Sequence, residues 1–174
     1  MPFIMKIIKL FLLAFCLVGF SHMSVAQTSI DAEASITLGA DVRVEKISDL
    51  HFGDIMGQPV GGAVRVNPSD GSVVNVSGNF QLLGNSTAAI FQVSGTSGQS
   101  FLIASGSYPA QITLRNEQGN TMIVNNFQII PSSGNLDNTG TALIKLGGTL
   151  NIGASQPAGN YTNTTDLTVT ISFQ

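Results

Sequence analysis

Side chains that could carry out chemistry are few in this sequence. Its 174 residues include one cysteine, Cys16, and two histidines, of which His51 lies in the main body of the chain. A hydrolase of the Ser–His type would have to use His51. A general acid and base pair would have to come from carboxylates such as Asp49 and Asp54, which flank Phe52-Gly53. The sequence therefore offers one histidine and one pair of carboxylates as catalytic candidates.

Each of these candidates has a structural explanation. His51 lies between Leu50 and Phe52 in an expected strand, so its side chain should point to the opposite face from both. Asp49 and Asp54 fit strand ends and turns, where aspartate bonds its own backbone. The sequence has neither a Gly-Lys-Ser/Thr phosphate loop nor a Gly-x-Ser-x-Gly elbow. We therefore predict that the protein is not an enzyme and uses no cofactor.

Two further carboxylates, Asp70 and Asp137, lie in polar segments where they could contact calcium. Calcium loops of the EF-hand type need alternating carboxylates, and the sequence contains no Asp-x-Asp-x-Asp stretch. We therefore predict no metal site.

The amino-terminal segment has the pattern of a secretory signal peptide. Lys6 and Lys9 precede an apolar run over residues 10–20, which is shorter than the roughly 20 residues of a membrane span. Small residues then lead to Ala26, so we predict a signal peptide over 1–26, cleaved between Ala26 and Gln27. Cleavage would remove Cys16, so the exported chain would depend on packing and strand pairing in place of disulfides.

The charge of the exported chain argues against several partners. Two of the seven Lys and Arg residues lie in the signal, which leaves five against ten Asp and Glu and a formal net charge of −5. A negative surface disfavours nucleic acid and anionic membranes. Since no long apolar segment follows residue 26, we also predict no stable membrane insertion after cleavage.

The rest of the chain has the pattern of short strands. Apolar residues recur at every second position, and clusters of Gly, Asn, Ser and Pro separate the stretches. The expected strands include 50–52, 63–66, 73–83 with a break near Gly78, 89–94, 99–104, 111–114, 121–130, 141–152 and 160–173. This series predicts one all-β domain, an antiparallel sandwich or barrel of about 8–10 strands.

The start of the strand series is unusually long. Eight successive even positions from Ile30 to Val44 are apolar, and one strand of that length would measure roughly 50 Å against a usual 17–20 Å. We therefore divide it near Gly39, into an extension at 27–39 and a domain at 40–174. The extension either bends and pairs with both sheets of its own sandwich, or leaves its own domain.

Five phrases in the sequence together resemble a known family. They are Leu50-His-Phe-Gly53, Val66-Asn-Pro-Ser-Asp-Gly71, Phe91-Gln-Val-Ser-Gly95, Gly148-Thr-Leu-Asn-Ile-Gly153 and Pro157-Ala-Gly-Asn-Tyr-Thr162. In this order they resemble bacterial secreted β-sandwich domains of unknown function, over residues 28–174. That family is similar to the spore coat protein U domain and to archaic chaperone–usher pilus subunits. The chain departs from archaic pilins in lacking their frequent cysteine pair.

The resemblance implies an immunoglobulin-like, Greek-key sandwich that lacks one strand. In such pilins the amino-terminal segment of the next subunit fills the groove, which is donor-strand complementation. The implied donor residues here are Ile30, Ala32, Ala34, Ile36 and Leu38. The implied groove residues, which a periplasmic chaperone would also grip, are Tyr161, Leu167, Val169, Ile171 and Phe173.

The function that we expect from this resemblance is that of a structural subunit of a bacterial surface fibre, a fimbria or pilus. Its partners would be further copies of itself joined head to tail, a periplasmic chaperone and an outer-membrane usher, and it would reach the cell surface through the periplasm. The alternative is a self-complete secreted adhesion module that binds a glycan or host surface through the loops at 57–62 or 131–140.

Overall fold

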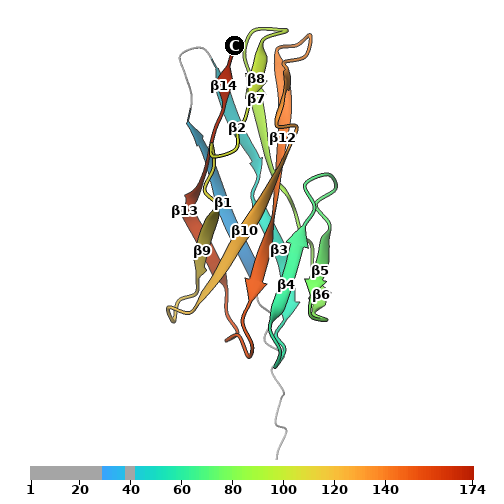
Figure 1. Cartoon of the computed structure of the whole chain (residues 1–174), viewed down its shortest axis with the longest axis vertical. Coiled ribbons are helices and arrows are strands. Elements are labelled where there is room, and N and C mark those ends of the chain that lie inside the picture. Colours follow the sequence, from blue (N-terminus) through green and yellow to red (C-terminus); the bar gives the residue numbers. More distant parts are fainter. Residues whose placement is uncertain (1–28, 38–41) are drawn as a thin grey trace, which may run out of the picture.

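The computed structural model of the chain describes residues 29–37 and 42–174, and strands joined by turns make up this part (Figure 1). In chain order the strands are β1 (Ser29–Thr37), β2 (Arg43–Ser48), β3 (Leu50–Met56), β4 (Gly62–Val66), β5 (Val73–Ser77), β6 (Gln81–Leu83), β7 (Ala89–Ser94), β8 (Ser100–Leu102), β9 (Gln111–Arg115), β10 (Thr121–Ile130), β11 (Ser133–Asn135), β12 (Thr141–Ile152), β13 (Tyr161–Thr170) and β14 (Ser172–Phe173). Within these ranges no helix is long and apolar enough to span a membrane.

The strands follow the apolar alternation of the sequence. In β7 the side chains of Ala89, Phe91 and Val93 are buried and those between them are half-buried. The bounds of β7, β10 and β12 coincide with the predicted strands 89–94, 121–130 and 141–152. Gly78, with a φ of +80°, separates β5 from β6 where the break was predicted.

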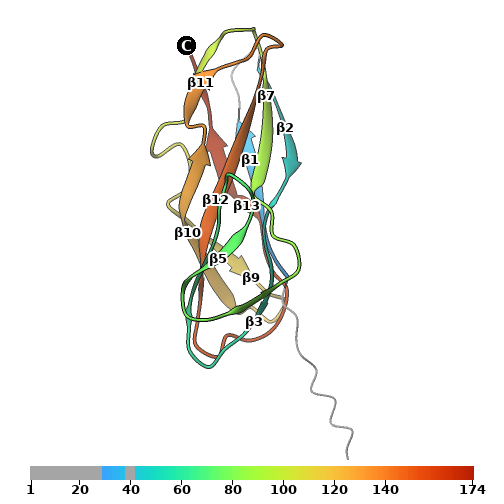
Figure 2. The ribbon, with the colours of Figure 1, turned by 90° about the vertical axis from the view of Figure 1, so that its right-hand side faces the viewer.

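The strands enclose a single apolar core. The larger sheet has the order β2-β7-β12-β10-β9-β13-β1-β3-β6, with β4 and β5 attached through β12, and it curls so that its two halves face each other (Figures 1 and 2). The small sheet has the order β11-β8-β14. Each pairing is antiparallel except that of β1 with β13. The predicted all-β, antiparallel immunoglobulin-like sandwich is confirmed, although the described residues form 14 strands where about 8–10 were predicted.

Strand β12 joins the parts of the larger sheet. One edge pairs with β10, and the other pairs with β7 through residues 141–146 and then with β4 through residues 149–152. The changeover falls at Gly147 and Gly148. A Cβ on Gly147 would collide with the carbonyl oxygen of Val66, and one on Gly148 would lie 3.0 Å from the Phe127 ring. Glycine at both positions therefore lets β4 and β10 approach β12 closely.

Two segments differ from their predicted structure. The predicted loop at 131–140 contains β11, which pairs with β8, and Leu136 beside it is buried. The predicted strand 160–173 divides after Thr170, whose backbone N–H donates to the Ser107 carbonyl at 2.8 Å, and β14 then joins the small sheet. Both differences arise because β8 lies within pairing distance of two segments that are remote from it in the sequence.

The connection from β12 to β13 is fixed by a buried tyrosine. Tyr161 has no exposed surface, and its hydroxyl donates to the carbonyl of Pro157 at 2.7 Å and accepts from Gln156 Nε2 at 2.9 Å. Gln156 also bonds the carbonyl of Thr121 and the backbone N–H of Gly153, each at 3.2 Å. A tyrosine that bonds the backbone a few residues upstream is the tyrosine corner of immunoglobulin-like sandwiches.

We expect Tyr161→Phe to lower the free energy of unfolding by about 0.5–1.5 kcal/mol, because it removes the part-buried hydrogen bond from the Tyr161 hydroxyl to the Pro157 carbonyl. Urea unfolding followed by circular dichroism measures this change. Tyr108→Phe is the matched control, since Tyr108 is half-buried at the edge of the core. Equal unfolding free energies for the two variants would contradict the role given to the Tyr161 hydroxyl.

The loop between β11 and β12 is closed by Asp137. Its Oδ1 accepts from the backbone N–H groups of Thr139 at 2.8 Å and Thr141 at 2.9 Å, and from the Thr139 hydroxyl at 2.6 Å. The Thr139 hydroxyl, followed by the Thr141 N–H, lowers the pKa of Asp137 to about 2. The carboxylate therefore holds this turn at neutral pH.

A carboxyl pKa below its usual 3.8 stabilises the fold above that pH and ceases to do so as the pH falls through about 2. We expect an NMR titration of the Asp137 carboxyl carbon to have its midpoint near 2, with the amide signals of Thr139 and Thr141 shifting in parallel. In Asp137→Asn these amide shifts should vanish over the same range. A midpoint near 3.8 would contradict the bonding described.

Candidate functional site

The residues named as catalytic candidates lie in or between β2 and β3, where they take part in strand pairing and in an ion pair. Leu50 and Phe52 are fully buried, and His51 between them is half-buried on the opposite face, as predicted. The backbone of His51 pairs with Thr87 through two hydrogen bonds of 2.9 Å. Asp49 lies between β2 and β3 and forms an ion pair of 2.8 Å with Lys46, whereas Asp54 lies within β3.

The two candidate calcium ligands close separate turns. Asp70 Oδ1 accepts from the backbone N–H of Ser72 at 3.0 Å and from its hydroxyl at 2.8 Å. These bonds lower the pKa of Asp70. Asp137 serves the turn before β12. Across residues 29–37 and 42–174, no three or more His, Cys, Asp or Glu side chains are grouped so that they could hold a metal ion.

The position of β1 between two other strands is the candidate functional feature of the fold. This strand runs parallel to β13 from Ile30 to Thr37 and antiparallel to β3 from Ser29 to Ala32. Its first half is therefore paired on both sides, while residues 34–37 pair with β13. We call the space between β3 and β13 the β1 slot. In Figure 1, β1 crosses beside β13 in the middle of the molecule.

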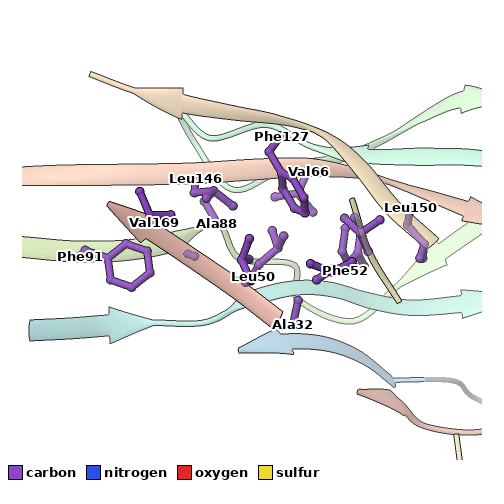
Figure 3. Close-up of a cluster of buried hydrophobic side chains, with 14 of the residues drawn as sticks. Ala32, Leu50, Phe52, Val66, Ala88, Phe91, Phe127, Leu146, Leu150 and Val169 are labelled. Carbon is purple, nitrogen blue, oxygen red and sulfur yellow. The ribbon is translucent and has the colours of Figure 1, made fainter. Parts of the chain in front are cut away.

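The walls of the β1 slot are apolar. Leu50 and Phe52 on β3, and Leu167 and Val169 on β13, are buried. Ala32 has no exposed surface and points from β1 toward Leu50 and Phe52 (Figure 3). A strand in this slot therefore closes the core as well as the sheet.

The predicted donor segment is the strand that occupies this slot within its own chain. The register places Ile30, Ala34 and Ile36 opposite Tyr161, Leu167 and Val169, all three of which are buried. Leu38 lies outside the described residues, as do the cleavage residues Ala26 and Gln27. Of the two interpretations of the extension, the one in which it pairs with its own domain therefore describes residues 29–37 of the single chain.

The predicted groove residues do not all line the β1 slot. Tyr161, Leu167, Val169 and Ile171 are buried, the first three of them on β13 opposite β1. Phe173 is half-buried and lies on β14, which pairs with β8 in the small sheet. The end of the chain therefore departs from the groove strand after Thr170.

A bulge in β13 was missed by the sequence analysis. Ala32 pairs with Asn163 and Ala34 with Leu167, so β13 contains two extra residues at this point. Asn163 Oδ1 accepts from the Asp166 N–H at 2.8 Å, and its Nδ2 donates to Asp166 at 2.6 Å and to the Thr113 carbonyl at 2.8 Å. The signal was the polar run 162–166, which interrupts the alternation between Tyr161 and Leu167.

The small size of residue 32 sets how closely β1 approaches the core. We expect Ala32→Leu to lower the free energy of unfolding by about 1–3 kcal/mol, because three further carbons would have to enter a fully packed site. Thermal unfolding measures the effect, and Ala110→Leu is the control because Ala110 is exposed just before β9. If the two variants unfold alike, Ala32 is not packed against β3 in solution.

Comparison with known proteins places the domain in a family. A search of curated proteins found no match to the chain. Residues 42–171 match the family described as Domain of unknown function (DUF4402). The matched range includes β2 to β13 and leaves out β1. Because the match covers more than half of the sequence, the chain belongs to this family, Domain of unknown function (DUF4402).

Proposed function

We propose that the protein is a structural subunit of a bacterial surface fibre, in which β1 of one copy enters the β1 slot of the next. The observation that carries this proposal is that a strand at one end of the described chain completes the sheet. One connection, residues 38–42, links β1 to the other strands. The same hydrogen bonds can therefore form with a β1 from another copy.

Such an exchange costs little energy, because identical contacts replace those that are lost. A β1 that leaves its slot uncovers apolar residues of β3 and β13, including Leu50, Phe52 and Leu167. It also leaves unpaired backbone groups on both neighbouring strands, which favours capture of another extended segment. The empty slot is thus complementary to a β1 from any copy.

The family match and the sequence resemblance support this interpretation of β1. The matched unit, residues 42–171, has both walls of the β1 slot but not the strand that fills it. Leu50-His-Phe-Gly53 lies in β3, and Pro157-Ala-Gly-Asn-Tyr-Thr162 leads into β13. Two of the five phrases that carry the resemblance therefore lie in, or lead into, the walls.

Strand exchange of this kind joins copies head to tail. Such a contact is heterologous and continues into a filament unless it closes into a ring. Before assembly the apolar walls have to be covered, either by the chain's own β1 or by a periplasmic chaperone. An outer-membrane usher and a position at the cell surface complete the proposal.

The alternative is a self-complete secreted module, and the pairing of β1 within its own chain favours it. In that case β1 stays in its slot and the sandwich serves as a rigid support for binding loops, such as those at 57–62 and 131–140. The two functions differ in which molecule's β1 lies beside β3.

A disulfide between positions 31 and 51 would show whether β1 and β3 belong to the same molecule or to two molecules. They lie opposite each other on β1 and β3, and the backbone groups of His51 are used by Thr87. The pair is therefore of the non-hydrogen-bonded type, with Cα atoms about 4.5 Å apart. This separation lies within the range of about 4.4–6.8 Å in which a disulfide can form.

We expect Asp31→Cys/His51→Cys, exported by its native host, to give a ladder of disulfide-linked species on a non-reducing gel. Each copy would form two disulfides, one with each neighbour: the cysteine at position 31 would bond one neighbour and the cysteine at position 51 the other. The single-cysteine variants are the controls and should give dimers at most. A monomer with an internal disulfide as the sole product would overturn the fibre proposal and favour the self-complete module.

A further inference from the structure

A pocket of about 270 Å³ lies on the outer face of the larger sheet, away from the β1 slot. Lys145 of β12 and Ile90 of β7 are register partners, and both line this pocket. Their chain neighbours Ile144, Leu146, Ala89 and Phe91 are buried, so Lys145 and Ile90 face outward. We propose that this pocket binds one neutral sugar ring of a glycan.

The pocket arises from the changeover of partners along β12. Pairing with β7 ends at Leu146, and pairing with β4 begins at Thr149, so the turn that follows β4 lies beside the changeover at Gly147. The turn at 67–72 and the segment 86–88 form two walls of the pocket, and Ser48 at the end of β2 closes a third side. The cavity is therefore part of the fold and not of one mobile loop.

The surface of the pocket is mainly apolar. Pro68, Ala88 and Ile90 line it, together with the aliphatic stem of Lys145. A sugar ring presents C–H groups on its faces, which pack against such a surface. Pockets for drug-sized ligands measure about 300–1,000 Å³, so a cavity just below that range suits one ring.

The polar groups of the pocket match the hydroxyls of a sugar. Lys145 Nζ donates to the Ser69 carbonyl at 2.9 Å, and an ammonium group has two further N–H groups to offer. The hydroxyls of Ser48 and Ser86 donate to backbone carbonyls at 2.8 and 2.7 Å, so their oxygens remain as acceptors. Sugar hydroxyls both donate and accept, and they can satisfy both kinds of group.

The charges of the pocket favour a neutral ligand. Asp70 lines the pocket with Lys145, and the two are close enough to interact electrostatically. One positive and one negative group give no net attraction for a carboxylate or a phosphate. Because Asp70 uses Oδ1 for Ser72, its second oxygen can accept from a ligand hydroxyl.

The walls of the pocket are held by backbone bonds. Asn67 N–H donates to the Ser72 carbonyl and Gly71 N–H to the Asn67 carbonyl, each at 2.9 Å. Thr87 is fixed by its two bonds to His51 in β3. A preformed pocket loses little conformational entropy on binding. The site is present whether β1 stays in its own slot or is exchanged, so this proposal does not rest on the fibre proposal.

The experiment is an NMR titration of the ¹⁵N-labelled exported chain with the methyl glycosides of glucose, galactose and mannose. We expect at least one of them to bind with a dissociation constant of about 1 mM, which corresponds to about 4.1 kcal/mol. The shifted amides should cluster at residues 69–71, 86–88 and 145. Lys145→Met should weaken binding at least tenfold, a change of about 1.4 kcal/mol. Lys46→Met, at an ion pair outside the pocket, should leave it unchanged.

A second variant distinguishes a loss of binding from a loss of folding. Ile90→Phe should fill the pocket and weaken binding, while the amide spectrum shows that the remaining strands are intact. Three outcomes would overturn the proposal: shifts that cluster at another surface, unaltered affinity in both pocket variants, or no shift with any of the three glycosides up to about 100 mM, a hundred times the expected dissociation constant. Tighter binding of methyl glucuronide than of the neutral glycosides would overturn the inference that the pocket prefers a neutral ligand. None of these results bears on the disulfide ladder.

Discussion

The insertion of β1 between β3 and β13 is the contact on which the rest of the fold depends. It joins two strands that would otherwise expose unpaired backbone groups, and it covers the apolar residues behind them. This closure is supplied by the first described strand and not by a hairpin within the domain. The closed core of the sandwich therefore depends on a strand that lies outside the family match at residues 42–171.

The bulge in β13 adapts that strand to two neighbours. Asn163 and Asp166 bond each other and the backbone between them, and Asn163 also reaches the Thr113 carbonyl of β9. Across the bulge, buried residues on β13 remain opposite alternate residues of β1. Because the bulge holds two extra residues and side chains alternate with a period of two, it changes the register but keeps the apolar side chains of β13 on the same face.

The paired glycines of β12 serve both the core and the surface. On the inner side Gly148 gives room to the Phe127 ring, and at the changeover Gly147 gives room to the end of β4. The outer pocket lies beside this changeover, where Lys145 of β12 contacts the turn that follows β4.

Sequence patterns were sufficient to predict the all-β class, the bounds of strands such as β7, β10 and β12, and the orientation of His51, because alternation and turn residues act between near neighbours. The resemblance to a known family also pointed to the segment that forms β1 and to β13 as its neighbour, but not to β3. Tertiary structure alone decided the parallel pairing of β1 with β13, the transfer of Phe173 to the small sheet and the outer pocket. Each of these depends on which remote strands lie side by side, and periodicity along one strand carries no information about its neighbour.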